Sequence, residues 1–173
     1  MTQREHLNAL CMEMIAHDRG DPKRIQHFLK VNAFAGLIGR AEGVDEHTLF
    51  LLEAAGYIHD IGIRLAEERY GYQNGQLQQE LGPAAARDML QRYGFQTEDV
   101  ERICWLVAHH HTYAGIDSAD WQILVEADFL VNLYEKQADR HTIESVGKNI
   151  FRTRTGKRLL DTIFEERSKE KIH

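Results

Sequence analysis

A ten-residue run, 49–58, contains one charged side chain, Glu53, and ends directly on His59 and Asp60. Such a run predicts a helix buried on most sides. Its last turn therefore carries an imidazole and a carboxylate into the interior. Burying an unpaired carboxylate is costly, and a bound metal is one of the few partners that offsets the cost. Candidate ligands elsewhere in the chain are His27, His109, His110, His111 and Asp128.

Helical periodicity dominates the chain and no strand alternation appears, so we predict an all-α, compact single-domain bundle of six to eight helices. The expected helices cover residues 2–17, 22–42, 45–62, 76–93, 97–111, 119–137, 141–150 and 155–170. Pro22 and Pro83, the two prolines, are each expected where a helix begins. Residues 64–75, which include Gly71, Asn74 and Gly75, are expected to be largely loop.

Composition narrows the class of protein. The 173 residues suit one domain with its own core. A net charge of −6 argues against a nucleic-acid polymer as partner. The two cysteines, Cys11 and Cys104, provide neither a disulfide framework nor a thiolate zinc site. Without a signal-peptide core or a run of about 18 apolar residues, we expect a cytoplasmic protein with no membrane partner.

Two of the candidate ligands lie within helical patterns. His27 lies beside an apolar, small-residue face of the helix expected over 22–42. Asp128 lies inside the apolar run of 121–131. Each residue also has a structural interpretation, because His27 could cap a core edge by hydrogen bonding and Asp128 could pair with an arginine from another helix.

The other candidates follow apolar helices. For both His59 and Asp60 to reach one ion, their helix must end around them, and Gly62 permits this. A buried hydrogen-bonded pair is the alternative. Of residues 109–111, one or two can face inward. The alternative there is a solvated helix end, where a cationic histidine meets the negative end of the helix dipole.

Taken together, the order His, His-Asp, His-rich pair, Asp resembles the HD superfamily of metal-dependent phosphohydrolases, over about residues 24–133. The pieces that carry the resemblance are Arg24-x-x-His27, Tyr57-Ile58-His59-Asp60-Ile61-Gly62, Leu81-Gly82-Pro83-Ala84-Ala85, His109-His110 and Ile123-Leu124-Val125-Glu126-Ala127-Asp128. We expect residues 1–173 to form one HD-type domain, with residues 134–173 as C-terminal helices that close the fold.

The resemblance implies roles for particular residues. The residues that match the family's metal ligands are His27, His59, Asp60 and Asp128. His110, with His109 as the next choice, matches a position that binds a second metal or contacts substrate. The resemblance also implies a small phosphoester as substrate, often a nucleotide.

The chain departs from the family pattern in two places. Members with two metals carry a further histidine before the Leu-Gly piece, whereas residues 76–80 contain none. We therefore expect one tightly held ion and leave a second metal open. The lysine that follows His-Asp-x-Gly in the family is replaced by Ile63, and Arg64 comes next. Arg64 is a candidate for binding phosphate, with a surface salt bridge as the alternative.

Imidazoles and carboxylates together suit Mn²⁺, Fe²⁺, Co²⁺, Ni²⁺ or Zn²⁺ better than Mg²⁺, which prefers oxygen. Such an ion lowers the pKa of bound water, toward about 7 in favourable zinc sites. Asp60 is expected to orient or deprotonate that water. His110 or His109 is expected to stabilise the developing charge or protonate the leaving oxygen.

Two other functions stay open. One is a non-catalytic, metal-stabilised module that binds or senses nucleotides. The other is an iron-dependent oxygenase, because some members of the superfamily hold two irons, although the missing histidine disfavours it. For the oligomeric state, a homodimer is the default expectation.

Overall fold

The computed structural model describes residues 1–166, and nine helices account for most of them. The helices are α1 (Gln3–His17), α2 (Pro22–Glu42), α3 (Glu46–Ile58), α4 (Gly62–Tyr70), α5 (Gly75–Arg92), α6 (Thr97–His109), α7 (Ala119–Glu135), α8 (Arg140–Asn149) and α9 (Arg154–Ile163). No strand occurs within this range. The all-α class is confirmed, with one helix more than the upper end of the expected number.

The additional helix is α4, which occupies residues expected to be loop. Gly71 and Asn74 indicate the ends of helices here and not a continuous loop. Gly71 adopts φ 77° and closes α4. Asn74 accepts a hydrogen bond from the backbone N–H of Leu77 and thereby caps α5. Only three residues, 72–74, separate Gly71 from the next helix.

The two prolines lie at different places in their helices. Pro22 is the first residue of α2, behind the N-cap Asp21, as expected. Pro83 lies inside α5, so the prediction that it opens a helix was wrong. The cap at Asn74 starts α5 well before the proline. The carbonyl of Pro83 accepts a hydrogen bond from Cys104 Sγ across the contact with α6.

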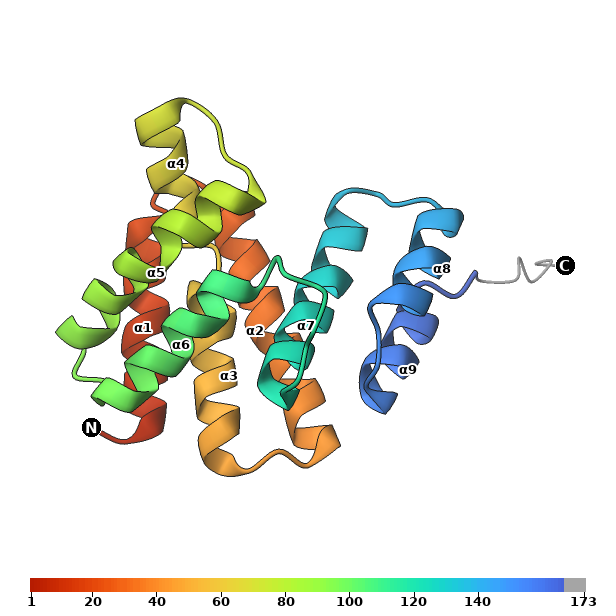
Figure 1. Cartoon of the computed structure of the whole chain (residues 1–173), viewed down its shortest axis with the longest axis horizontal. Coiled ribbons are helices and arrows are strands. Elements are labelled where there is room, and N and C mark those ends of the chain that lie inside the picture. The colour runs from red at the N-terminus through yellow and green to blue at the C-terminus, as the bar shows by residue number, and fades with distance from the viewer. Residues whose placement is uncertain (167–173) are drawn as a thin grey trace, which may run out of the picture.

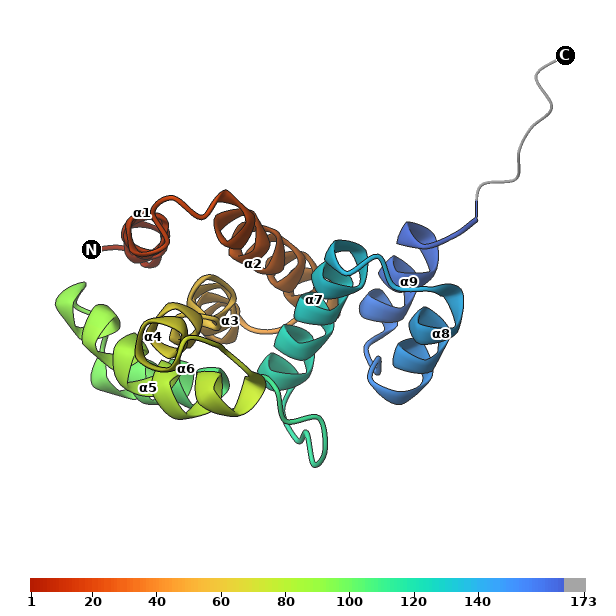
Figure 2. The ribbon, with the colours of Figure 1, turned by 90° about the horizontal axis from the view of Figure 1, so that it is seen from above.

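Helices α2, α3 and α7 pack against one another, and α5 packs on α6 and α4. Figures 1 and 2 show the α8–α9 pair on the side of α7 that faces away from α3, α5 and α6. α9 contacts α2 and α7. The last helix ends at Ile163 and not at residue 170 as expected, and residues 167–170 of that prediction lie outside the described range.

Two glycines allow close helix contacts around the His-Asp pair. A Cβ at Gly56 would lie 2.8 Å from Asn32 Cα in α2. A Cβ at Gly62 would lie 2.9 Å from the backbone of Gln78 and Gly82 in α5. Backbones therefore approach closely on both sides of residues 59–60, which holds this segment in the interior.

Across residues 1–166, no helix combines the length and the apolar character that crossing a bilayer requires.

Candidate metal centre

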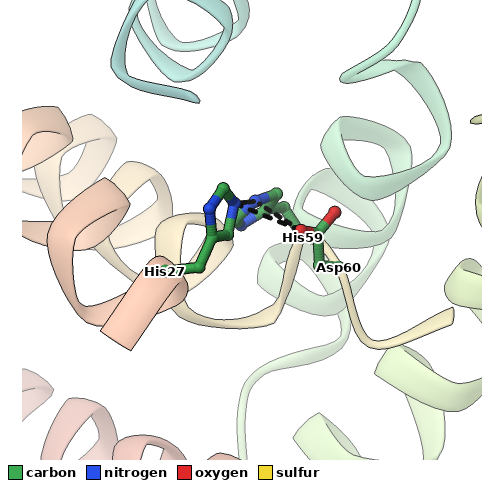
Figure 3. A group of neighbouring side chains, drawn as sticks. All are labelled: His27, His59 and Asp60. Carbon is green, nitrogen blue, oxygen red and sulfur yellow. Dashed lines mark hydrogen bonds and ion pairs between the residues drawn. The ribbon is translucent and has the colours of Figure 1, made fainter. Parts of the chain in front are cut away.

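The centre begins where α3 ends. α3 buries most of its surface and stops at Ile58, and the chain then turns into α4 within three residues. The backbone N–H of Ile61 donates to the carbonyl of Ile58 in this turn. The helix thus ends around His59 and Asp60, as their joint use requires. Figure 3 shows both side chains converging with His27 from α2.

Four side chains from three helical segments meet at one point. Nε2 of His27 lies 3.3 Å from Nε2 of His59, 3.2 Å from Oδ2 of Asp60 and 3.1 Å from Oδ1 of Asp128. Nε2 of His59 lies 3.4 Å from Asp60 Oδ2 and 3.5 Å from Asp128 Oδ1. The structural alternative for Asp128, an arginine partner, is not what the described residues show.

These separations fit a shared ion. Nitrogen and oxygen ligands about 2.1 Å from one metal lie about 3.0–3.4 Å apart in tetrahedral or octahedral arrangements. The separations between the imidazoles and the carboxylates of the cluster are 3.1–3.5 Å. The donor atoms of His27, His59 and Asp60 all lie within 4.8 Å of one another and could hold a divalent cation, and Asp128 Oδ1 lies 3.1 and 3.5 Å from the two imidazoles of this group.

In the cluster, the positive charges of the histidines and the negative charges of the aspartates stabilise one another. Burial opposes the charged form of His27, but hydrogen bonds to Asp128 and Asp60 outweigh it and raise its pKa to about 9. The same balance raises the pKa of His59. Burial likewise opposes ionisation of both aspartates, yet the histidines hold the pKa of Asp60 and of Asp128 well below the usual range. A metal cation would take the place of the protons between these carboxylates.

The outer ring nitrogens fix which nitrogen points inward. Nδ1 of His59 lies 2.9 Å from the carbonyl oxygen of Gly56, and Nδ1 of His110 lies 2.7 Å from that of Val107. A carbonyl oxygen only accepts, so in both rings Nδ1 carries the proton and donates. In a neutral ring, Nε2 then has a free lone pair for a ligand, as in second-shell arrangements of metal sites.

His110, the residue directly after α6, faces the cluster. Its Nε2 is buried, lies 3.3 Å from Asp60 Oδ1 and finds no hydrogen bond of acceptable geometry among residues 1–166. Orphaned buried polar atoms are uncommon in folded proteins. The atom is thus available to a ligand bound beside Asp60.

Of the predicted site residues, the structure does not bring His109 and Arg64 to the cluster. The His109 ring stacks on Trp105 at 3.9 Å between centroids, and its Nδ1 donates to the Trp105 carbonyl. Arg64 donates to Glu68 at 2.8 Å and to the carbonyl of His17. The salt-bridge alternative for Arg64 is what the structure contains.

His111 lies nearer the cluster than its neighbour His109 does. Its ring centroid is 3.9 Å from that of His110, and the two rings form a second group of donor atoms with Asp60. Nε2 of His111 lies 2.8 Å from Oε1 of buried Gln78. Gln78 belongs to the 76–80 segment, where two-metal members of the resembled family carry a histidine.

Two residues of α7 near the centre were missed from sequence. Asn132 donates to Oδ1 of Asp128 at 2.9 Å. The carboxylate of Glu135 accepts from His27 Nδ1 at 3.1 Å and from Lys30 Nζ at 3.0 Å. Both lie at helical spacing from Asp128, four and seven residues on, and this spacing was the available signal. Glu135 gives His27 the same outer support that carbonyls give His59 and His110.

Comparisons with known proteins identify the family. A family profile described as HD domain matches residues 24–144. The crystal structure of a predicted HD superfamily hydrolase from an uncultured Thermotogales bacterium matches with a TM-score of 0.61 at 26% sequence identity, over 92% of this chain and 83% of that one. No curated protein gives a significant match. The resemblance drawn from the motifs is confirmed.

Proposed function

The chain belongs to the HD domain family, and from this premise we propose that it is a metal-dependent phosphohydrolase acting on a small phosphoester. The observation that carries the proposal is the convergence of His27, His59, Asp60 and Asp128 at 3.1–3.5 Å beside the orphaned Nε2 of His110. Family membership supplies the reaction class, and the cluster supplies side chains able to perform it.

The residues that would hold the ion are His27, His59, Asp60 and Asp128. A divalent transition metal there, Mn²⁺, Fe²⁺, Co²⁺, Ni²⁺ or Zn²⁺, supplies Lewis-acid activation of water and screens charge on a phosphoryl oxygen. We propose a single ion. Asp60, His110 and His111 form a second donor group, but Nε2 of His111 is already engaged by Gln78.

In hydrolysis, a water oxygen forms a bond to phosphorus, the bond from phosphorus to the leaving oxygen breaks, and the leaving oxygen takes a proton. Asp60 has one oxygen, Oδ2, toward His27 and His59 and the other, Oδ1, toward His110. It is therefore placed to orient water and accept its proton. Protonated at Nε2, His110 is placed to stabilise charge on the leaving oxygen and to donate the proton.

The test combines metal content with turnover. Elemental analysis of the purified protein is expected to find about one transition metal per chain, and a phosphatase screen with Mn²⁺, Co²⁺ and Ni²⁺ is expected to find activity on small phosphoesters. Asp60→Ala is expected to lose bound metal and turnover together. Full metal content and full activity in this variant would show that the site is wrongly assigned.

A further inference from the structure

A cleft of about 220 Å³ opens beside the metal centre, between the first turn of α2 and the C-terminal end of α7. Its lining includes His27 and Asp60 of the centre together with Lys23 and Lys136. His27 is buried and the Asp60 side chain is 14% exposed, whereas both lysines are exposed. The lysines therefore form the rim of the cleft, and the metal centre lies deeper.

Other charged side chains of this cleft already have ion partners. Arg24 pairs with Asp21 at 3.5 Å and with Glu67 at 3.1 Å. Glu135 pairs with Lys30 at 3.0 Å as well as with the imidazole behind it. These charges are therefore paired within the protein.

The two rim lysines are different. Within the described residues, neither Lys23 nor Lys136 has a carboxylate at ion-pair distance. They belong to separate helices, Lys23 to the first turn of α2 and Lys136 to the C-cap of α7. Two cations without ion-pair partners at the mouth of one cleft would attract an anion. In a chain of net charge −6, they would offset the repulsion that an anionic substrate meets as it approaches.

The shape of the cleft limits what else binds there. Its lining contains no Phe, Tyr or Trp side chain on which a nucleobase could stack. Its volume also lies below the roughly 300–1,000 Å³ of pockets that enclose drug-sized ligands. A phosphoryl group with a short leaving group fits these features better than a nucleoside does.

We infer that the substrate is a small phosphomonoester whose leaving group carries a second anionic group, carboxylate or phosphate, recognised by Lys23 and Lys136 at the cleft rim. The inference rests on the proposed function, because the scissile phosphoryl group is placed at the metal centre. The inference places the second anion, a few bonds away, toward the rim.

Two compounds that differ only at the second group test this. 3-Phosphoglycerate and glycerol 3-phosphate share the phosphoryl end, and only the first has a carboxylate at the other end. With the Mn²⁺-loaded protein, kcat/KM is expected to be about tenfold higher for 3-phosphoglycerate, since exposed charge contacts are worth up to about fivefold each. Added salt should reduce this ratio. Adenosine monophosphate, without a second anion, should be the poorer substrate.

Charge-removal variants locate the preference. Lys23→Met and Lys136→Met are each expected to lower the ratio of the two kcat/KM values about threefold, and the double variant to bring it close to one. Lys157→Met, which removes a lysine from the remote α8–α9 groove, is the matched control and should keep the ratio. Titration calorimetry of the wild type with both compounds gives a second readout that does not need turnover.

The outcomes separate this inference from the proposed function. Turnover of both compounds at equal kcat/KM, preference for adenosine monophosphate, or equal losses for both compounds in the lysine variants would overturn the anion-recognition inference alone. Absence of turnover for every phosphoester and metal would overturn the proposed function. Tighter calorimetric binding of 3-phosphoglycerate, lost in the double lysine variant, would still support the anion site in that case.

Discussion

Two carboxylates on α7, only two residues apart, have opposite uses. Glu126 and Asp128 are both buried, at 0% and 3% exposure. Glu126 accepts hydrogen bonds from the backbone N–H groups of Arg152 and Thr153, just before α9, and from the side chain of Gln122, one turn earlier on α7. Asp128 instead contacts two imidazoles, that of His27 on α2 and that of His59 at the end of α3.

The difference teaches that burial alone does not identify a functional carboxylate. Glu126 is surrounded by neutral donors, two backbone N–H groups and the side chains of Gln122 and Thr153, which satisfy its hydrogen bonding without another ion. Asp128 instead lies beside two imidazoles, which can either carry a proton or bind a metal, and near the carboxylate of Asp60. The partners of a buried charge, and not its depth, separate an anchor from a ligand.

The largest expected effect is that substitutions of these two residues act on different properties, one on metal affinity and the other on the free energy of unfolding. Asp128→Ala should weaken metal binding at least about 100-fold, because even outer-sphere partners of metal ligands cost about 10–100-fold when removed. Glu126→Ala should keep its metal but lower the free energy of unfolding by about 3 kcal/mol, because it leaves buried N–H groups of residues 152 and 153 without an acceptor. Metal titration and urea unfolding of the metal-free proteins measure the two effects.

A matched control exists for the anchor. Glu42 also accepts a hydrogen bond near the start of α9, from the N–H of Thr155, but at an exposed position. Glu42→Ala should therefore cost much less stability than Glu126→Ala. If Glu126→Ala lost its metal as fully as Asp128→Ala, the distinction between anchor and ligand would not hold.

A smaller effect on metal affinity is expected at Glu135, whose carboxylate accepts the hydrogen bond of His27 Nδ1 and so orients this proposed ligand. Glu135→Gln keeps an acceptor for His27 Nδ1 but removes the charge, so metal affinity should fall about tenfold. Glu53→Gln is the control, because this partly buried carboxylate of α3 pairs with Arg40 and not with a histidine. Competition with a chromogenic chelator measures both affinities. Unchanged affinity in Glu135→Gln would remove this residue from the support of the centre.

The comparison also explains what could be predicted from sequence. Eight of the nine helices follow from the periodicity, whereas α4 was missed. The grouping of His27, His59, Asp60 and Asp128 was predictable from the order of the motifs that resemble the family, supported by the principle that a buried charge requires a partner. Glu135 and Asn132 were not, since polar residues near the end of a helix are usually solvated. His109 and His111 could not be separated from His110, because the direction of each ring depends on where α6 ends and on Trp105 and Gln78, which are distant in sequence.

The smallest expected effect on stability is at Asp120, in the first turn of α7. Its partner is neither a neutral donor nor an imidazole but the guanidinium of Arg102. Asp120 accepts two hydrogen bonds from Arg102, at 2.7 and 2.8 Å. Burial opposes ionisation, but these bonds hold the pKa of Asp120 below its usual value. Because the pKa is lower in the folded state, ionised Asp120 stabilises the fold at pH values above its unfolded-state pKa of about 3.9. This contribution is lost as the pH falls through the folded-state pKa.

Asp120→Asn should therefore cost about 1 kcal/mol of unfolding free energy at pH 6 in the metal-free protein, with the gap to wild type closing below about pH 4. Urea unfolding at a series of pH values measures this gap. Metal affinity should not change, because Asp120 binds an arginine that has no contact with the cluster among residues 1–166. If the gap stayed constant from pH 6 to pH 3, Asp120 would stabilise α7 by packing and not through its charge. Its role would then be structural, like that of Glu126.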